Sequence, residues 1–126
     1  MKKVLIADDN ADFLNILRLS LEGKGYEIKC VTSKRDLFLS IKNFLPDIIL
    51  LDVFLDKFDG RQICKEITDS LTLKNLPIII FSANPYSLSH YELYGANDYI
   101  DKPISIPLLI EKIENLLRSK KYIEKN

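Results

Sequence analysis

Five polar side chains lie where they could act together on a phosphoryl group. Each follows or ends an apolar run of strand length, and they are Asp8, Asp9, Asp52, Ser82 and Lys102. In a doubly wound α/β sheet, the loops at the carboxyl ends of the strands form the ligand crevice. Three carboxylates, a hydroxyl and an ammonium group in one crevice would suit a hard divalent cation and a phosphate. Zinc is not indicated, because the set contains no His or Cys.

Asp52 is the acid of this set that is placed to act as a nucleophile, because it ends the most apolar run, 48–51. An ionised aspartate can attack phosphorus to form an acyl phosphate, while a metal ion and a lysine neutralise charge on the phosphoryl oxygens. A single aspartate after a strand is usually only a turn former or a helix cap, so the hypothesis depends on the whole set. Mg²⁺ is the expected ion, and Mn²⁺ is an acceptable substitute.

The elements that must position these side chains follow from an alternation of strand-length runs with segments of helical period. This pattern is typical of repeated βα units around a parallel sheet. The expected strands are 3–7, 26–31, 47–52, 77–82 and 97–101. The expected helices are 12–23, 34–44, 60–71, 86–94 and 106–119.

The apolar pattern also indicates which strands are central. The runs 4–6, 48–51 and 78–81 are continuously apolar, as expected of strands that helices cover on both faces. Residues 26–31 instead alternate, which predicts a half-exposed strand near an edge. Apolar stripes predict the helix faces that pack on the sheet, and they comprise Leu14, Leu17, Leu21, Leu37, Ile41, Phe44, Leu109, Ile113 and Leu116. Ser105 is the expected cap of the last helix.

Length and composition predict one compact domain over residues 1–120, followed by a polar tail at 121–126. The chain of 126 residues is 47% hydrophobic and 29% charged, with no stretch long and apolar enough to span a membrane. The basic start gives way to Asp8 and Asp9 after a short apolar run, so no signal peptide is indicated and a cytoplasmic location is expected. With 18 basic and 18 acidic residues, no global field favours nucleic acid or an anionic membrane.

The remaining reactive side chains have simpler interpretations. Cys30 and Cys64 lie in apolar-patterned segments and are expected to be small buried side chains rather than a disulfide or metal pair. His90, the single histidine, is expected to be a solvated surface residue.

The chain resembles the receiver domain of response regulators over essentially its whole length. The motifs that carry the resemblance are Asp8-Asp9, Asp52, the loop 55–60, Ser82-Ala83, the run 95–99 and Lys102-Pro103. Each motif alone is weak, but all of them occur in order at the spacings of the family. The resemblance implies a flavodoxin-like doubly wound (βα)5 fold, with a five-stranded parallel sheet in the order 2-1-3-4-5.

The resemblance also implies roles for individual residues. Asp9 and Asp52 would ligate Mg²⁺ through their carboxylates, Phe54 through its backbone carbonyl, and Asp8 through a bound water. Asp52 would carry the phosphoryl group, and Lys102 would pair with it.

Three further positions carry implied roles. The Ser82 hydroxyl would bond a phosphoryl oxygen and leave space that Tyr99 fills by turning inward, although a plain core aromatic is an equal alternative for Tyr99. Pro103 would follow a cis peptide bond. Two departures stand out, because Asp56 replaces the usual proline and Ser82 the commoner threonine.

The resemblance implies a signalling phosphoacceptor and not an enzyme in the usual sense. The donor would be a sensor histidine kinase or a histidine phosphotransfer protein. An output protein would bind the face formed by 86–94, 97–101 and 106–119. Phe54 and Asn84 would flank the phosphoryl group and influence its lifetime.

Two alternatives remain open at this point. One is a phosphorylation-independent interaction module of the same fold. The other is a small Mg-dependent phosphohydrolase or a flavodoxin-like binder of a flavin phosphate. Phe54 argues against a haloacid-dehalogenase-like phosphatase, which normally has an acid two residues after its nucleophile. The flavin alternative lacks a Gly- or Ser/Thr-rich phosphate loop after the first strand.

Overall fold

A five-stranded parallel sheet forms the centre of the protein. The structure is a computed structural model that describes residues 1–125, and the side chains of residues 1–119. The sheet has the order β2-β1-β3-β6-β7. Its strands are β1 (Lys3–Ala7), β2 (Glu27–Val31), β3 (Ile48–Asp52), β6 (Ile78–Ser82) and β7 (Asp98–Asp101). Numbered along the chain within this sheet, they lie in the order 2-1-3-4-5, which confirms the predicted fold.

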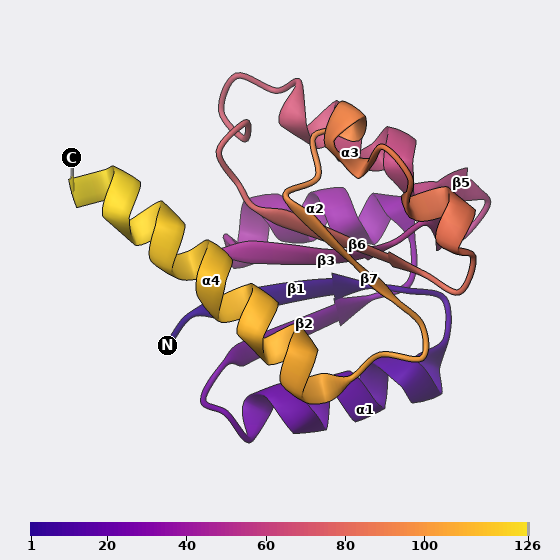
Figure 1. Cartoon of the computed structure of the whole chain (residues 1–126), viewed down its shortest axis with the longest axis horizontal. Coiled ribbons are helices and arrows are strands. Elements are labelled where there is room, and N and C mark those ends of the chain that lie inside the picture. The colour runs from indigo at the N-terminus through magenta and orange to yellow at the C-terminus, as the bar shows by residue number, and fades with distance from the viewer. Residues whose placement is uncertain (126) are drawn as a thin grey trace.

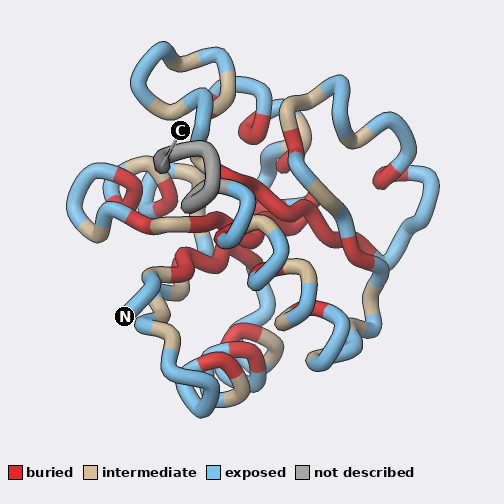
Figure 2. Tube along the Cα trace, turned by 60° about the vertical axis from the view of Figure 1, so that its left-hand side comes forward, coloured by how far each residue is buried: buried red, intermediate tan, exposed pale blue. Residues whose placement is uncertain are grey.

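Helices cover both faces of this sheet, as Figure 1 shows. They are α1 (Ala11–Glu22), α2 (Lys34–Phe44), α3 (Gly60–Thr68) and α4 (Ile106–Lys125). One apolar core joins α2 and α3 to the sheet, and a second joins α1 and α4 to its opposite face. The central strands β1, β3 and β6 are almost wholly buried (Figure 2), as their continuous apolar runs predict.

The predicted helix stripes are largely confirmed, as is the predicted cap at Ser105, and Ser33 is a further cap. Leu14, Leu17 and Leu21 are buried under α1, while Phe44 and Leu116 are only partly buried. The hydroxyl of Ser33 accepts a hydrogen bond from the Asp36 backbone N–H, and that of Ser105 accepts one from the Leu108 backbone N–H. Each bond satisfies a donor that the first helical turn leaves free.

The helix predicted at 86–94 is wrong. Two short 3-10 helices stand there instead, η1 (Pro85–Leu88) and η2 (Tyr91–Tyr94). The break falls at Ser89, which is extended, and at His90, which has a φ of 56° in the left-handed region. Ser, His and Tyr residues are moderate to weak helix formers, and no apolar stripe compensates for them here.

Two helix ends and one loop also differ from the sequence prediction. Helix α3 ends at Thr68 rather than residue 71. Helix α4 continues to Lys125, so the segment expected to be a polar tail extends the helix, and Asn126 lies outside the described residues. The segment after Asp52 forms a short antiparallel hairpin of β4 (Phe54–Leu55) and β5 (Phe58–Asp59).

Gly60 allows this hairpin and α3 to lie against the end of β3. A Cβ atom at this position would overlap the Asp52 carbonyl oxygen. The Gly60 backbone N–H also donates a hydrogen bond to the Val53 carbonyl. A glycine is therefore required where the chain turns back beside Asp52.

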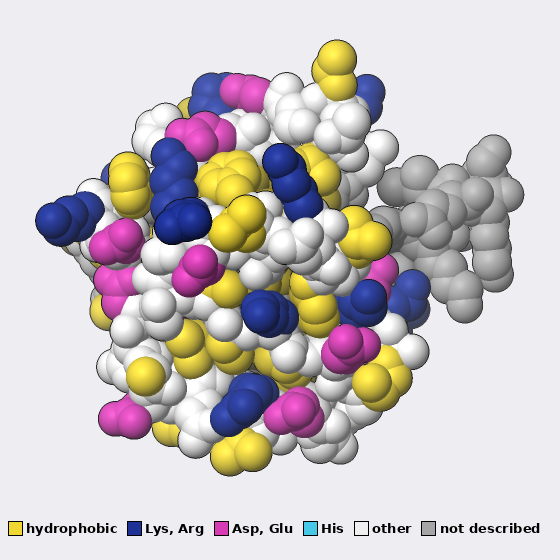
Figure 3. Space-filling view, turned by 180° about the vertical axis from the view of Figure 1, so that it is seen from behind, with side chains coloured by type: hydrophobic (Ala, Val, Ile, Leu, Met, Phe, Trp, Pro, Cys, Tyr) yellow, Lys and Arg dark blue, Asp and Glu magenta, His cyan; other side chains and the backbone are white. Residues whose placement is uncertain are grey.

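The surface supports the charge argument made from composition. Figure 3 shows basic and acidic side chains interspersed over one face of the molecule, with no area of a single sign. Within residues 1–125, no helix combines the length and apolarity that crossing a membrane would need.

Candidate functional site

Lys102 joins two acids of the predicted set at the carboxyl edge of the sheet. Its Nζ lies 2.8 Å from Oδ2 of Asp8 and 3.2 Å from Oδ2 of Asp52. Asp8 follows β1, Asp52 ends the neighbouring β3, and Lys102 follows β7, so three strand ends meet at one ammonium group. The peptide bond from Lys102 to Pro103 is cis, as predicted.

Burial and charge raise the pKa of the Asp52 carboxyl group. Burial is the largest cause and the negative charge of Asp8 the second, and together they raise the pKa from 3.8 to about 6. The charge and hydrogen bond of Lys102 and the Phe54 backbone N–H, 3.3 Å from Oδ1, oppose this rise. For Lys102, burial favours the neutral form, but the bonds and charges of both acids outweigh it and raise its pKa.

We expect Asp52→Asn to stabilise the metal-free fold above pH 6. Because the pKa of Asp52 is raised, the folded protein holds this proton more tightly than the unfolded chain, and stability falls as pH rises from 3.8 to about 6. Asparagine does not titrate, so the variant avoids this loss. Above pH 6 its free energy of unfolding should exceed that of the parent by about 1 to 2 kcal/mol, after allowance for solvent at the crevice. Urea unfolding in EDTA at pH 4 and pH 7.5 would measure it. An equal difference at both pH values would contradict the assignment.

Asp9 differs from the other two acids in its exposure and its contact. Its side chain is exposed, and its Oδ1 accepts a hydrogen bond of 2.6 Å from the Asp56 backbone N–H. Asp56 has a φ of 59°, in the left-handed region, at the turn of the hairpin. Over the described part of the chain, no group of three or more His, Cys, Asp or Glu side chains is gathered closely enough to hold a metal ion.

The donor atoms available at this edge nevertheless suit a hard divalent cation. They are carboxylate and carbonyl oxygens, from Asp8, Asp9, Asp52 and the backbone of Phe54, with no sulfur or imidazole among them. Magnesium binds such sites through one or two carboxylates and retains several waters, so a preformed cage of three side chains is not needed. By its chemistry, then, the set fits the predicted ion.

Asp9→Asn should weaken Mg²⁺ binding more than Asp8→Asn does. Asp8 is already engaged by Lys102 and by the Asn10 backbone N–H, 2.8 Å from its Oδ1, whereas the Asp9 side chain is exposed and is bonded through Oδ1 to the Asp56 backbone N–H. Loss of a direct ligand should lower affinity by at least about tenfold. Isothermal titration of both variants with MgCl₂ would measure this. A weaker-binding Asp8 variant would show that the two roles are reversed.

Ser82 and Asn84 lie in one turn at the end of β6. The Ser82 Oγ is buried and accepts a hydrogen bond of 3.0 Å from the Asn84 backbone N–H. The Asn84 side chain caps η1 by accepting a bond of 3.0 Å from the Tyr86 backbone N–H. The Ser82 hydroxyl proton therefore remains available to another acceptor. The side-chain oxygen of Asn84, in contrast, is already bonded to the Tyr86 N–H.

Tyr99 is partly exposed in this structure. Its side chain is 39% exposed, and its ring lies 4.9 Å from that of Tyr91 in η2. Lys112 of α4 stands over the Tyr99 ring at 5.2 Å and bonds Asp98 at 2.9 Å. Tyr99 thus joins η2 and α4 through its ring, and its predicted inward turn remains a prediction.

Sequence reasoning missed two contacts of the site. The rings of Phe13 in α1 and Phe81 in β6 lie 4.5 and 5.3 Å from the Lys102 Nζ, where their π-faces stabilise the ammonium group. Phe81 directly precedes Ser82, so its position at a strand end was a usable signal. The contact of Phe13, like the bond from Asp56 to Asp9, has no signature in the sequence.

The other predicted residues lie away from the site. Cys64 is buried, which raises the pKa of its thiol to about 12, and Cys30 is half-buried. Both are free thiols, and the predicted burial is confirmed for Cys64 but only in part for Cys30. His90 is exposed, as predicted.

Comparison with known proteins supports one family. The model of the response regulator receiver domain matches residues 4–114. The uncharacterized transcriptional regulatory protein YvcP of Bacillus subtilis is 33% identical over 120 residues, which cover 94% of this chain and 49% of YvcP. The chain thus spans about half the length of that relative.

Two solved structures are similar in fold. A CheY-like response regulator receiver domain protein of Methanospirillum hungatei JF-1 has a TM-score of 0.86 at 26% identity, covering 97% of this chain and 98% of that one. NtrX of Brucella abortus has a TM-score of 0.89 at 25% identity, covering 99% of this chain and 29% of NtrX. With the family model spanning nearly the whole sheet and the crevice acids, this chain belongs to the response regulator receiver domain family.

Proposed function

We propose that the chain is a phosphoacceptor that takes a phosphoryl group on Asp52 in a two-component or phosphorelay system. The observation that carries the proposal is the ammonium group of Lys102, which contacts the carboxylates of both Asp8 and Asp52 at the sheet edge. An ammonium group so placed can neutralise charge on a phosphoryl group that is attached to Asp52.

In the proposed reaction, an Asp52 carboxylate oxygen attacks the phosphorus of a phosphohistidine or a small acyl phosphate. The P–N or P–O bond to the donor breaks, and the acyl phosphate bond to Asp52 forms. Bound Mg²⁺, held by Asp9, Asp52 and the Phe54 carbonyl, would supply positive charge beside the phosphoryl oxygens. Ser82, whose hydroxyl proton is free, would donate to one of those oxygens.

Signalling in this proposal passes from Ser82 to the surface formed by η1, η2, β7 and α4. Movement of the Ser82 hydroxyl toward a phosphoryl oxygen would alter the turn that it shares with Asn84 and with the start of η1. Tyr99 contacts η2 and stands beside Lys112 of α4, so its inward turn would change this surface. An output protein that binds the surface would then distinguish the two states, and the donor would be a cytoplasmic histidine kinase or phosphotransfer protein.

The test is incubation with a small acyl phosphate and Mg²⁺, followed by intact mass spectrometry. A lasting gain of one phosphoryl group supports the proposal. Continuous hydrolysis of the donor without an adduct would indicate a phosphohydrolase. An unchanged mass with intact donor would favour a phosphorylation-independent interaction module. Omission of Mg²⁺ is the matched control, and labelling that is undiminished in EDTA would contradict the metal requirement.

A further inference from the structure

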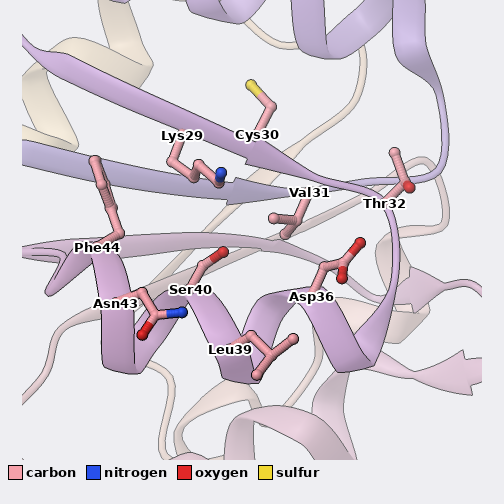
Figure 4. A pocket seen from close by; sticks show the side chains of 9 residues that line it. All are labelled: Lys29, Cys30, Val31, Thr32, Asp36, Leu39, Ser40, Asn43 and Phe44. Carbon is pink, nitrogen blue, oxygen red and sulfur yellow. The ribbon is translucent and has the colours of Figure 1, made fainter.

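The free edge of strand β2 lies between two grooves. The groove on the α2 face has a volume of about 540 Å³ and is lined by the edge strand and by residues such as Leu39, Ser40 and Asn43 (Figure 4). A second groove, of about 610 Å³, lies between the same strand and α1. Lys29 and Cys30 line both grooves, so side chains of the flanking helices do not cover the strand edge.

The hydrogen bonds of β2 show which backbone groups are free. Its only sheet neighbour within the described residues is β1. The Glu27 N–H donates to the Lys2 carbonyl at 2.9 Å, and the Val31 carbonyl accepts from the Asp8 N–H at 3.2 Å, so these odd-numbered positions bond inward. Because bonding direction alternates along a strand, the N–H and C=O groups of Ile28 and Cys30 point outward.

We propose that this edge pairs with the same edge of a second copy of the chain, antiparallel and centred on Ile28. In an antiparallel ladder, residues that exchange both backbone bonds stand directly opposite each other. Centring on Ile28 places the outward groups of Ile28 opposite those of the second Ile28. Tyr26 then stands opposite Cys30, and because the Tyr26 N–H already donates to the Leu21 carbonyl at 3.3 Å, its C=O is the group that can accept from the Cys30 N–H of the other copy. The backbone also allows a ladder centred on Lys29, in which Ile28 bonds Cys30 of the other copy, but it would place the two like-charged Lys29 side chains directly opposite each other.

Charge complementarity selects this register among those that the backbone allows. Centring on Ile28 brings Glu27 of each copy opposite Lys29 of the other, and both side chains are exposed on the α2 face. These two positions are a pair without backbone bonds, where opposing side chains approach most closely. Centring on Cys30 would leave Lys29 opposite Val31, without a charged partner. Lysines commonly protect sheet edges from pairing, but here the alternating charges are self-complementary.

The two grooves accommodate the incoming strand. The two-fold axis of such a pair is perpendicular to the sheet. The face covered by α1 in one copy therefore lies on the same side of the joined sheet as the face covered by α1 in the other. The second Ile28 would lie toward the groove beside α1, because Ile28 of this copy packs on that face. Figure 4 shows Lys29 directed toward the α2 groove and Cys30 toward the opposite face, consistent with this alternation.

Charge reversal tests the pairing by sedimentation of the unphosphorylated protein over a wide concentration range. The parent should dimerise, and Lys29→Glu or Glu27→Lys alone should weaken the dimer by at least about tenfold, because like charges then oppose. The double variant should dimerise again. Mixing the two single variants should give a heterodimer, since one presents two lysines and the other two glutamates. Lys65→Glu on α3 carries the same charge change away from β2 and should behave as the parent.

Amide hydrogen exchange tests the register. Protection of the Ile28 and Cys30 amides should rise with protein concentration in the parent but not in Lys29→Glu. A parent that is monomeric at every concentration would overturn the proposal. So would a dimer to which both single reversals are indifferent, because another face would then form it.

Discussion

Asp52→Asn is expected to abolish phosphorylation by small acyl phosphates while the fold remains intact. Asparagine has nearly the shape of aspartate, and its one side-chain oxygen can still accept a hydrogen bond from either the Phe54 backbone N–H or Lys102, the two donors that bond Asp52. The amide is neither an anion nor a nucleophile, however, and no acyl phosphate can form on it. Intact mass after incubation with donor and Mg²⁺ should show full loss of the adduct.

A matched variant separates loss of the acceptor from general loss of negative charge. Asp101→Asn makes the same change on an exposed side chain at the end of β7, outside the contacts of Lys102, and should be labelled as the parent is. Circular dichroism should show the same fold for both variants. Stoichiometric labelling of Asp52→Asn on another residue would show that Asp52 is not the acceptor.

The sequence was most informative about the sheet and the crevice. Continuous apolar runs mark strands that are buried on both faces, and the alternation at β2 marks the edge, so the strand order could be assigned once the family resemblance was added. Polar residues at strand ends meet because parallel strands point their carboxyl ends the same way. The contact of Lys102 with Asp8 and Asp52, which are 94 and 50 residues away in the chain, follows from that rule.

The parts that could not be predicted depend on backbone conformation and on contacts between loops. The left-handed conformation of His90, which its residue type alone does not indicate, divides the segment 86–94 into η1 and η2. The bond from the Asp56 N–H to Asp9 could not form with proline, which has no backbone N–H and cannot adopt the positive φ of Asp56. The sequence shows that Asp56 replaces the usual proline of the family, but it does not show that the Asp56 N–H bonds Asp9.

The lifetime of the phosphorylated state depends on whether a water can line up behind the phosphorus. Phe54 follows Asp52 by two residues, and its side chain is 58% exposed beside the acceptor, where it offers no hydrogen bond to a water. Asn84 follows Ser82 by two residues, and its carbonyl oxygen already caps η1 through the Tyr86 N–H. Neither side chain can therefore orient an attacking water, and we predict slow autodephosphorylation.

Replacing Phe54 with Asn and Asn84 with Glu together should accelerate hydrolysis by about ten- to a hundredfold. The amide at position 54 and the carboxylate at position 84 can each hold a water in line with the phosphorus, and positioning of this kind lowers the barrier substantially. Phe54→Leu keeps an apolar side chain and should decay at close to the parent rate. Decay of the adduct in Mg²⁺, followed by intact mass after removal of the donor, gives both rates. If the double variant loses its phosphoryl group no faster than the parent, water access is not limited by Phe54 and Asn84, and the slow step lies elsewhere in the crevice.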